Sequence, residues 1–293
     1  MSSSERRVRF EGAGGVCLAA NTYGNPGGAP VLLLHGGGQT RHAWSGTARR
    51  LADAGFHAVA LDLRGHGDSD WASDGDYSID AFAGDLRAVA TTFAAPPAVV
   101  GASLGGGVAL VAEGEATGPL SSAVVLVDIA HRIEMDGAMR ILGFMTGRPQ
   151  GFASLEEAAD AIAEYLPHRP RPTDLSGLTK NLRQGTDGRY RWHWDPALFQ
   201  GHLTPASAQD PERRVLAARG LDVPTLLVRG RMSDLLSEEA AAEFLELVPH
   251  AEFVDVRDAG HMVAGDRNDV FTDAVAGFLI RHLHAGDRAG GVA

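Results

Sequence analysis

Short apolar runs alternate with longer segments of helical periodicity along most of the chain. The runs at residues 31–34, 58–61, 98–100, 123–127, 225–228 and 252–256 have the length and composition of buried strands. Amphipathic segments between them predict helices at about residues 42–54, 78–93, 103–115 and 237–247. This alternation is typical of a mostly parallel sheet covered by helices on both faces. The pattern therefore predicts an α/β fold that begins with an antiparallel hairpin near residues 6–10 and 16–23.

The alternation of strands and helices stops after Asp128. From about 130 to 220 no run has convincing strand character, and Met, Arg, Pro and Trp become frequent. One helix is well marked there, because Ser154 and Glu157 form a capping box at the start of the periodic residues 155–166. We therefore expect a helical insertion between two core strands. The expected division is a core of 1–129 and 221–285, an inserted domain of 130–220 and a frayed tail of 286–293.

Composition and charge exclude several classes of protein. Of the 293 residues, 44% are hydrophobic and 22% are charged, which is typical of a globular chain with enough apolar residues for a core. The net charge of −11 argues against nucleic acid as a partner, because nucleic-acid-binding proteins carry a basic excess. The single cysteine, Cys17, rules out an intrachain disulfide and fits a reducing compartment. Since neither a signal sequence nor a membrane-spanning run is visible, we expect a cytoplasmic protein without a membrane span.

The strongest chemical signal is a G-x-S-x-G motif at residues 101–105. The motif follows a predicted strand and opens a predicted helix, which is the setting of a nucleophile elbow. A serine on such a strained turn projects its hydroxyl from the edge of the sheet. Gly101 and Gly105 lack Cβ atoms and so let the strand and the helix pack closely around the turn. Ser103 is therefore the predicted nucleophile.

A serine hydroxyl is a weak nucleophile and needs a base that an acid orients. His261 is the predicted base, because it follows the last predicted strand after a short loop and the base comes last in chains with such an elbow. Asp234 is the predicted acid. It follows the strand at 225–228 and so lies at a carboxyl strand end, where ligands gather in an open α/β sheet. Asp128, just after the preceding core strand, is the alternative acid.

Chemistry at a carbonyl also needs hydrogen-bond donors for the oxyanion that develops. The backbone N–H of Leu104, directly after the nucleophile, is the predicted first donor. The N–H of Gly37, in a glycine turn at residues 36–38, is the predicted second donor. A further motif, at residues 62–69, follows a strand and holds two glycines and several short polar side chains. We expect this motif to be a structural loop held by its own hydrogen bonds.

Cofactor and metal sites find no support in the sequence. The glycine turn at 36–38 is not followed by the Gly-Lys-Ser/Thr of a phosphate loop. No His-x-x-x-His pair or cysteine cluster has the spacing of metal ligands. We therefore expect no cofactor and no metal, and a small acyl compound as the substrate. Whether the chain forms a homo-oligomer stays open.

Together these motifs resemble the α/β-hydrolase superfamily, and within it the capped branch of bacterial esterases, cofactor-free haloperoxidase-like perhydrolases, epoxide hydrolases and C–C bond hydrolases. The matching residues follow the family order through nearly all of 30–280: Leu33-Leu34-His35-Gly36, Trp44, Asp62-x-Arg64-Gly65-His66-Gly67-x-Ser69, Gly101-x-Ser103-x-Gly105-Gly106, Asp234 and Gly260-His261. The resemblance implies an eight-stranded sheet, with residues 130–220 as a helical lid over the pocket. Epoxide hydrolases and haloalkane dehalogenases of this branch carry aspartate at the elbow, which argues against both activities here.

Three side chains of the expected lid are candidates for substrate binding. Trp192 and Trp194 alternate in an extended stretch and so face the same side, and Met145 suits an adaptable apolar wall. All three also suit packing of the lid onto the core, which we expect to be their main role.

The sequence thus predicts a carboxylesterase-like serine hydrolase. Its predicted substrate is a small to medium uncharged carboxylic ester, thioester or lactone, which reacts through an acyl-enzyme. A C–C bond hydrolase or a perhydrolase with the same triad is the alternative enzyme. A ligand-binding protein on a hydrolase scaffold is the non-enzymatic alternative.

Overall fold

One eight-stranded sheet forms the centre of the molecule. The computed structural model describes residues 5–167, 171, 173–199, 210–257 and 268–283. The strand order is β1-β2-β4-β3-β5-β6-β9-β10, in which β2 is antiparallel to β1 and β4 and every other neighbouring pair is parallel. The strands are β1 Arg6–Glu11, β2 Cys17–Tyr23, β3 Pro30–Leu34, β4 His57–Leu61, β5 Ala98–Ala102, β6 Ala123–Val127, β9 Thr225–Gly230 and β10 Glu252–Val256. The predicted mostly parallel sheet and its antiparallel hairpin are therefore confirmed.

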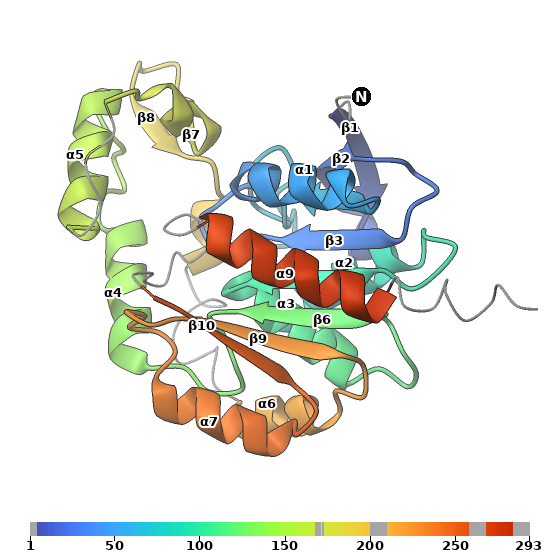
Figure 1. Cartoon of the computed structure of the whole chain (residues 1–293). Coiled ribbons are helices and arrows are strands. Elements are labelled where there is room, and N and C mark those ends of the chain that lie inside the picture. Colours follow the sequence, from blue (N-terminus) through green and yellow to red (C-terminus); the bar gives the residue numbers. More distant parts are fainter. Residues whose placement is uncertain (1–4, 168–170, 172, 200–209, 258–267, 284–293) are drawn as a thin grey trace, which may run out of the picture.

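Helices cover both faces of this sheet (Figure 1). One face is covered by α1 Ser45–Asp53 and α9 Asn268–Leu283. The other face is covered by α2 Ile79–Ala90, α3 Leu104–Gly114, α6 Pro211–Arg219 and α7 Glu238–Leu247. None of the described helices is both long enough and apolar enough to cross a membrane.

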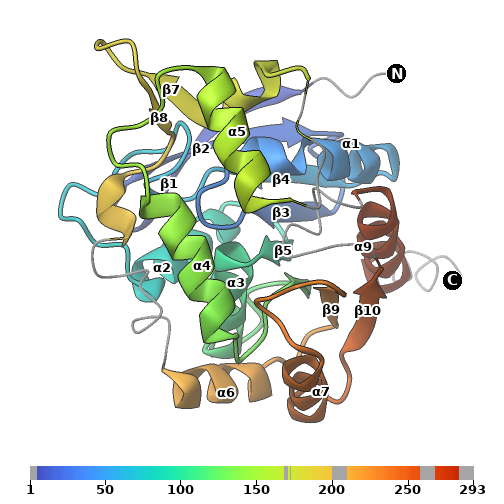
Figure 2. The same ribbon diagram turned by 90° about the vertical axis from the view of Figure 1, so that its left-hand side faces the viewer.

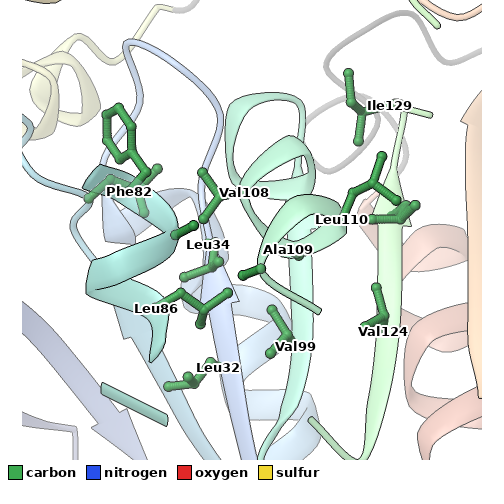
Figure 3. Packing of buried hydrophobic residues seen from close by; sticks show 14 of the residues in the cluster. Leu32, Leu34, Phe82, Leu86, Val99, Val108, Ala109, Leu110, Val124 and Ile129 are labelled. Carbon is green, nitrogen blue, oxygen red and sulfur yellow. The ribbon is translucent and has the colours of Figure 1, made fainter. Parts of the chain in front are cut away.

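The central strands are apolar on both sides because each face meets a helical layer. Leu32 and Leu34 of β3 pack against the layer of α2 and α3, as Figure 3 shows. Val31 and Leu33, at the positions between, pack against α1 and α9. Successive residues of a strand point to opposite faces, so two apolar layers make the whole strand apolar. Full burial of each such side chain contributes about 1.5–3 kcal/mol to folding.

The described residues between β6 and α6 lie at the edge where the parallel strands end (Figures 1 and 2). It forms α4 Met135–Thr146, α5 Leu155–Tyr165 and a hairpin of β7 Leu182–Gln184 and β8 Tyr190–Trp192. Helix α5 begins as predicted, because Ser154 Oγ accepts the Glu157 N–H at 3.2 Å. The expectation of a segment without strands was wrong, since β7 and β8 pair over only three residues each and leave too short a pattern to detect.

Backbone hydrogen bonds attach this intervening segment to the core at two places. At the hairpin end, the Gly67 N–H donates to the His193 carbonyl at 2.9 Å. At the α4 end, the Glu134 N–H donates to the Leu235 carbonyl at 2.9 Å. Both core partners lie in loops that follow strands of the sheet.

Helix α6 belongs to the core rather than to the intervening segment. A Cβ atom built at Gly114 of α3 would lie 2.0 Å from the Ala217 carbonyl oxygen of α6, so the two helix backbones are in contact. The expected boundary at residue 220 therefore moves to before Pro211. The predicted frayed tail, 286–293, lies outside the described residues.

A buried ion pair joins α2 to the loop after β4. The guanidinium of Arg64 donates to both carboxylate oxygens of Asp85 at 2.6 Å, and the two side chains are 4% and 3% exposed. Asp85 also accepts the Ala13 N–H at 2.9 Å. A bidentate pair of this kind satisfies both ions in a site that water does not reach.

Replacement of Asp85 by alanine should therefore be strongly destabilising, because it leaves the buried Arg64 guanidinium without its carboxylate. We expect a loss of about 3–5 kcal/mol in the free energy of unfolding, measured by urea denaturation. Asp273→Ala is the matched control, because the ion pair of Asp273 with Arg50 is exposed and surface pairs contribute little. Equal losses in the two variants would contradict the prediction.

Candidate active site

Ser103 occupies a strained turn between β5 and α3. Its backbone angles are φ 47° and ψ −112°, in the positive-φ region that residues other than glycine rarely adopt. The turn is held by the bond from the Ser103 N–H to the Val127 carbonyl of β6, at 3.0 Å. Ser103 is only partly buried, so a ligand can approach it. This is the geometry that the G-x-S-x-G motif predicts.

Glycines make room for the turn at each close contact. A Cβ atom at Gly101 would lie 2.3 Å from the Gly105 carbonyl oxygen, and one at Gly105 would lie 2.5 Å from the Leu34 carbonyl oxygen. A Cβ atom at Gly106 would lie 2.3 Å from a methyl group of Ile129. The end of β3, the end of β5 and the first turn of α3 therefore meet around Ser103.

The glycine turn after β3 lies directly against the nucleophile. A Cβ atom at Gly36 would be 3.4 Å from Ser103 Cβ, and one at Gly37 would be 4.0 Å from Leu104 Cβ. The two predicted oxyanion donors, Gly37 and Leu104, are thus adjacent in space.

Most N–H groups around this point already have acceptors. The Gly36 N–H donates to Gln39 Oε1 at 3.0 Å, and the Gly38 N–H donates to His66 Nε2 at 3.1 Å. On the α3 side, the Gly105 N–H donates to the His35 carbonyl at 3.2 Å. Within the described part of the chain, the N–H groups of Gly37 and Leu104 have no recorded acceptor. Two neighbouring donors are therefore available beside the serine.

Two buried neutral histidines hold the glycine turn. His35 Nδ1 donates to the Gly36 carbonyl at 2.8 Å, and His35 Nε2 accepts the Leu63 N–H at 3.0 Å. Because a peptide group is planar and trans, a bond to the Gly36 carbonyl also fixes the direction of the Gly37 N–H. Burial lowers the pKa of His35 from 6.5 to about 4. Burial, with His35 nearby, lowers the pKa of His66 from 6.5 to about 3.

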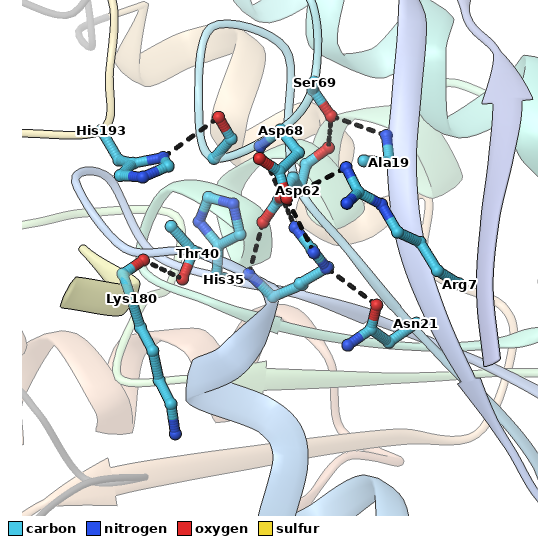
Figure 4. A network of polar contacts seen from close by, with 12 residues as sticks. Arg7, Ala19, Asn21, His35, Thr40, Asp62, Asp68, Ser69, Lys180 and His193 are labelled. Carbon is cyan, nitrogen blue, oxygen red and sulfur yellow. Dashed lines mark hydrogen bonds and ion pairs between the residues drawn. The ribbon is translucent and has the colours of Figure 1, made fainter. Parts of the chain in front are cut away.

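The loop at residues 62–69 is held by its own hydrogen bonds, as predicted. Asp62 accepts the N–H groups of Arg41 at 2.6 Å and Asp68 at 2.9 Å, and its carboxylate forms an ion pair with the Arg41 guanidinium. Ser69 Oγ donates to the Asp62 carbonyl at 2.7 Å and accepts the Ala19 N–H at 2.9 Å. Figure 4 shows this network beside His35. Since Arg41 closely follows the glycine turn, the network ties that turn to the loop.

The two candidate acids occupy neighbouring positions with different partners. Asp128 is fully buried, with φ 53°. Its carboxylate accepts the Gly230 N–H at 3.0 Å and the Ser233 hydroxyl at 2.5 Å. Asp234 is partly exposed and forms an ion pair with Arg140 of α4 at 3.0 Å. Asp128 therefore holds the loop that carries Asp234.

The predicted base, His261, lies outside the described residues, as does Gly260. Its distance from Ser103 Oγ and from either acid therefore stays a prediction. Among the described residues, no group of three His, Cys, Asp or Glu side chains is arranged to hold a metal ion.

Two of the three substrate-binding candidates contact the glycine turn. A Cβ atom at Gly38 would lie 2.3 Å from Met145 Cε and 3.0 Å from the Trp194 ring. Trp192 stacks on Trp194 with 4.9 Å between ring centroids and 9° between planes, so the two rings do share a side. Trp192 also packs against Phe152, at 5.3 Å between centroids. Met145 and Trp194 therefore lie against the glycine turn, and Trp192 lies one layer further away.

Two contacts of the site were missed by the sequence analysis. The ion pair of Arg140 with Asp234 joins residues far apart in the chain, and the bond of His66 to the Gly38 N–H joins two loops. The only signal for the second contact was the presence of a histidine between two glycines in the loop at 62–69.

Comparisons with known proteins identify the fold family and several similar hydrolases. Residues 29–267 match the family described as the alpha/beta hydrolase fold. Esterase Rv0045c of Mycobacterium tuberculosis is 32% identical over 263 residues, which cover 86% of this chain and 84% of the esterase. The 3-hydroxybutyrate-oligomer hydrolase of Cupriavidus necator is 27% identical over 256 residues, which cover 83% of this chain and 86% of that hydrolase. The crystal structure of E-2-(acetamidomethylene)succinate hydrolase has a TM-score of 0.83 and 25% identity, covering 94% of this chain and 99% of that one.

The low pKa of His66 predicts a pH-dependent stability. Between its unfolded pKa of 6.5 and its folded pKa of about 3, the unfolded chain binds a proton at His66 that the folded chain does not. Stability therefore decreases as the pH falls below 6.5. We expect His66→Gln to flatten this dependence by up to about 1.4 kcal/mol per pH unit, measured by urea unfolding between pH 8 and pH 5. The same slope in wild type and variant would contradict a neutral His66.

Proposed function

Because the chain belongs to the α/β-hydrolase fold family, we propose that it is a serine esterase that acts through an acyl-enzyme on Ser103. Its assignment as a hydrolase of this fold follows from the family match and from the esterase and hydrolase relatives. The proposed substrates are small to medium uncharged carboxylic esters, thioesters or lactones.

One observation carries the proposal: a strained, accessible serine lies beside two N–H groups with no recorded acceptor among the described residues. The strain at Ser103 costs about 1–3 kcal/mol, and a fold keeps such strain where its surroundings enforce it, often at active sites. Because the glycine turn lies against Ser103 and Leu104, we place the oxyanion between the N–H groups of Gly37 and Leu104. The first turn of α3 adds the positive end of its helix dipole at the same point.

The proposed reaction has two steps. His261 takes the hydroxyl proton as Ser103 Oγ attacks the ester carbonyl, and the N–H groups of Gly37 and Leu104 bind the oxyanion. The same imidazole then protonates the leaving alcohol and later activates water, which releases the acid from the acyl-enzyme. Asp234 orients His261 and stabilises its charged form. His261 enters this proposal from its place in the sequence alone.

The wall beside the glycine turn supports an uncharged substrate. Met145 and Trp194 present a thioether and an indole ring next to Gly38, and both are 7% exposed. A charged group would lose its hydration against these apolar side chains, whereas an apolar acyl or alcohol group would not. The names of two relatives, an esterase and an oligomer hydrolase of a hydroxy acid, favour an ester over a C–C bond or a peracid.

Covalent labelling tests the nucleophile directly. We expect a fluorophosphonate to label the wild-type protein at Ser103 and p-nitrophenyl acyl esters to be hydrolysed. Ser103→Ala should abolish labelling and lower kcat by at least about 10⁴-fold. Ser122→Ala, a partly buried serine away from the site, is the control and should keep both.

Absence of labelling and of ester turnover in the folded wild type would contradict the esterase proposal and favour a ligand-binding protein. Parallel rates on an ester, a lactone and a ring-fission β-diketone, together with a peracid assay, compare the esterase with the C–C hydrolase and the perhydrolase.

Matched asparagine variants distinguish the two acids. We expect Asp234→Asn to lower kcat by about 10³–10⁴-fold with little loss of stability, because the imidazole loses its orienting carboxylate. Asp128→Asn should instead destabilise the protein by about 1–3 kcal/mol, because the Ser233 hydroxyl loses its acceptor. Ester hydrolysis and urea unfolding measure the two effects. A larger loss of kcat in Asp128→Asn than in Asp234→Asn would make Asp128 the acid.

A further inference from the structure

We propose that His66 is a positioning residue for the oxyanion-binding turn, acting through its hydrogen bond to the Gly38 N–H. The inference rests on the proposed function, because it concerns how the Gly37 N–H is held toward the substrate. The His66 ring contacts Gly38, the Arg64 carbonyl and His35, so it acts on the substrate through the glycine turn.

The turn needs support from other residues, because its three glycines have no side chains and the next residue, Gln39, bonds to Gly36 at one end of the turn. Residues 36–38 are three consecutive glycines, which have the widest choice of backbone conformations of any residue. Gly38 has φ +77°, a value that glycine adopts without strain but does not prefer over its alternatives. Hydrogen bonds to the peptide groups on both sides of Gly37 must therefore fix the direction of its N–H.

His35 and His66 each fix one of these two peptide groups. The Gly36–Gly37 peptide is held at its carbonyl by His35 Nδ1, at 2.8 Å. The Gly37–Gly38 peptide is held at its N–H by His66 Nε2, at 3.1 Å. With His66 as acceptor, both planes around Gly37 are fixed. Without it, the Gly37–Gly38 peptide has no partner for its N–H and is free to rotate.

His66 itself is rigidly placed. It is fully buried, and its Nδ1 bonds to the Arg64 carbonyl at 3.0 Å, which leaves Nε2 as the acceptor. Its backbone N–H donates to the Leu63 carbonyl and its carbonyl accepts the Ser69 N–H, both at 3.0 Å. The His35 ring packs edge-on at 5.0 Å between centroids.

The same histidine connects the turn to the intervening segment. His66 and Trp194 form an antiparallel β-bridge, while the Trp194 ring packs against Gly38. The backbone that carries Trp194 and the glycine turn therefore meet at one residue.

Two amide variants separate the acceptor role from mere packing. In His66→Gln, Oε1 reaches the place of Nε2 and accepts the Gly38 N–H. In His66→Asn, the shorter side chain retains a donor for the Arg64 carbonyl but falls short of Gly38. We expect His66→Asn to lower kcat for p-nitrophenyl ester hydrolysis by about 10–100-fold, below the 10²–10³-fold cost of losing a donor entirely. His66→Gln should stay within about threefold of wild type, and KM should change little in either variant.

A control variant in the same loop and a measurement of amide exchange distinguish loss of the Gly38 hydrogen bond from a general effect on the loop. Ser69→Ala removes two hydrogen bonds of the same loop, to Asp62 and Ala19, but no bond to Gly38. This variant should retain kcat. All variants are assayed at a temperature where circular dichroism shows them folded. The Gly38 amide proton should exchange slowly in wild type and His66→Gln, and fast in His66→Asn, by NMR.

Equal loss of kcat in both His66 variants, an equal loss in Ser69→Ala, or fast exchange of the Gly38 amide in wild type would each overturn the inference. Failure of wild type to hydrolyse esters or to accept the fluorophosphonate would instead contradict the proposed function. In that case the exchange data alone still decide whether His66 holds the turn.

Discussion

The close approach of three backbones around Ser103 is the constraint on which the rest of the site depends. The ends of β3 and β5 and the first turn of α3 come so near each other that side chains at Gly101 and Gly105 would clash with main-chain atoms. The strained conformation of Ser103 persists because the surrounding sheet and helix are packed on both faces and cannot relax around it. The apolar layers of the core thus have a local consequence, since they hold one residue at φ 47°.

Main chain and side chains have different roles around Ser103. The main chain of β3 and α3 brings the glycine turn against the nucleophile, and the bond from the Gly105 N–H to the His35 carbonyl joins the two. Side chains then hold the turn, through Gln39, His35 and His66. Charged groups lie around these neutral groups, in the buried Arg41–Asp62 pair and on the loops after β6 and β9. The polar part of the site is therefore built largely from neutral groups in fixed directions, which need no reorganisation when charge develops.

Much of this arrangement could be predicted from the sequence because its signals are local. Apolar runs marked the strands, and the flanks of Ser103 marked the elbow, since both patterns follow from the next few residues. The hairpin β7–β8 gave no such signal, because its strands have three residues each. The pairing of Arg140 with Asp234 and the bond of His66 to Gly38 depend on how distant segments pack. A single sequence carries no periodicity for contacts of that kind.

The attachment of the intervening segment at both of its ends bears on how this protein can diversify. One attachment is the hydrogen bond between Gly67 and His193, and the other is the hydrogen bond between Glu134 and Leu235. The segment between these two bonds includes α5, which takes part in neither of them. Substitutions around α5 leave both of these backbone hydrogen bonds in place. Substitutions around α5 can therefore accumulate, by evolution or by design, without removing the hydrogen bonds that join the intervening segment to the core.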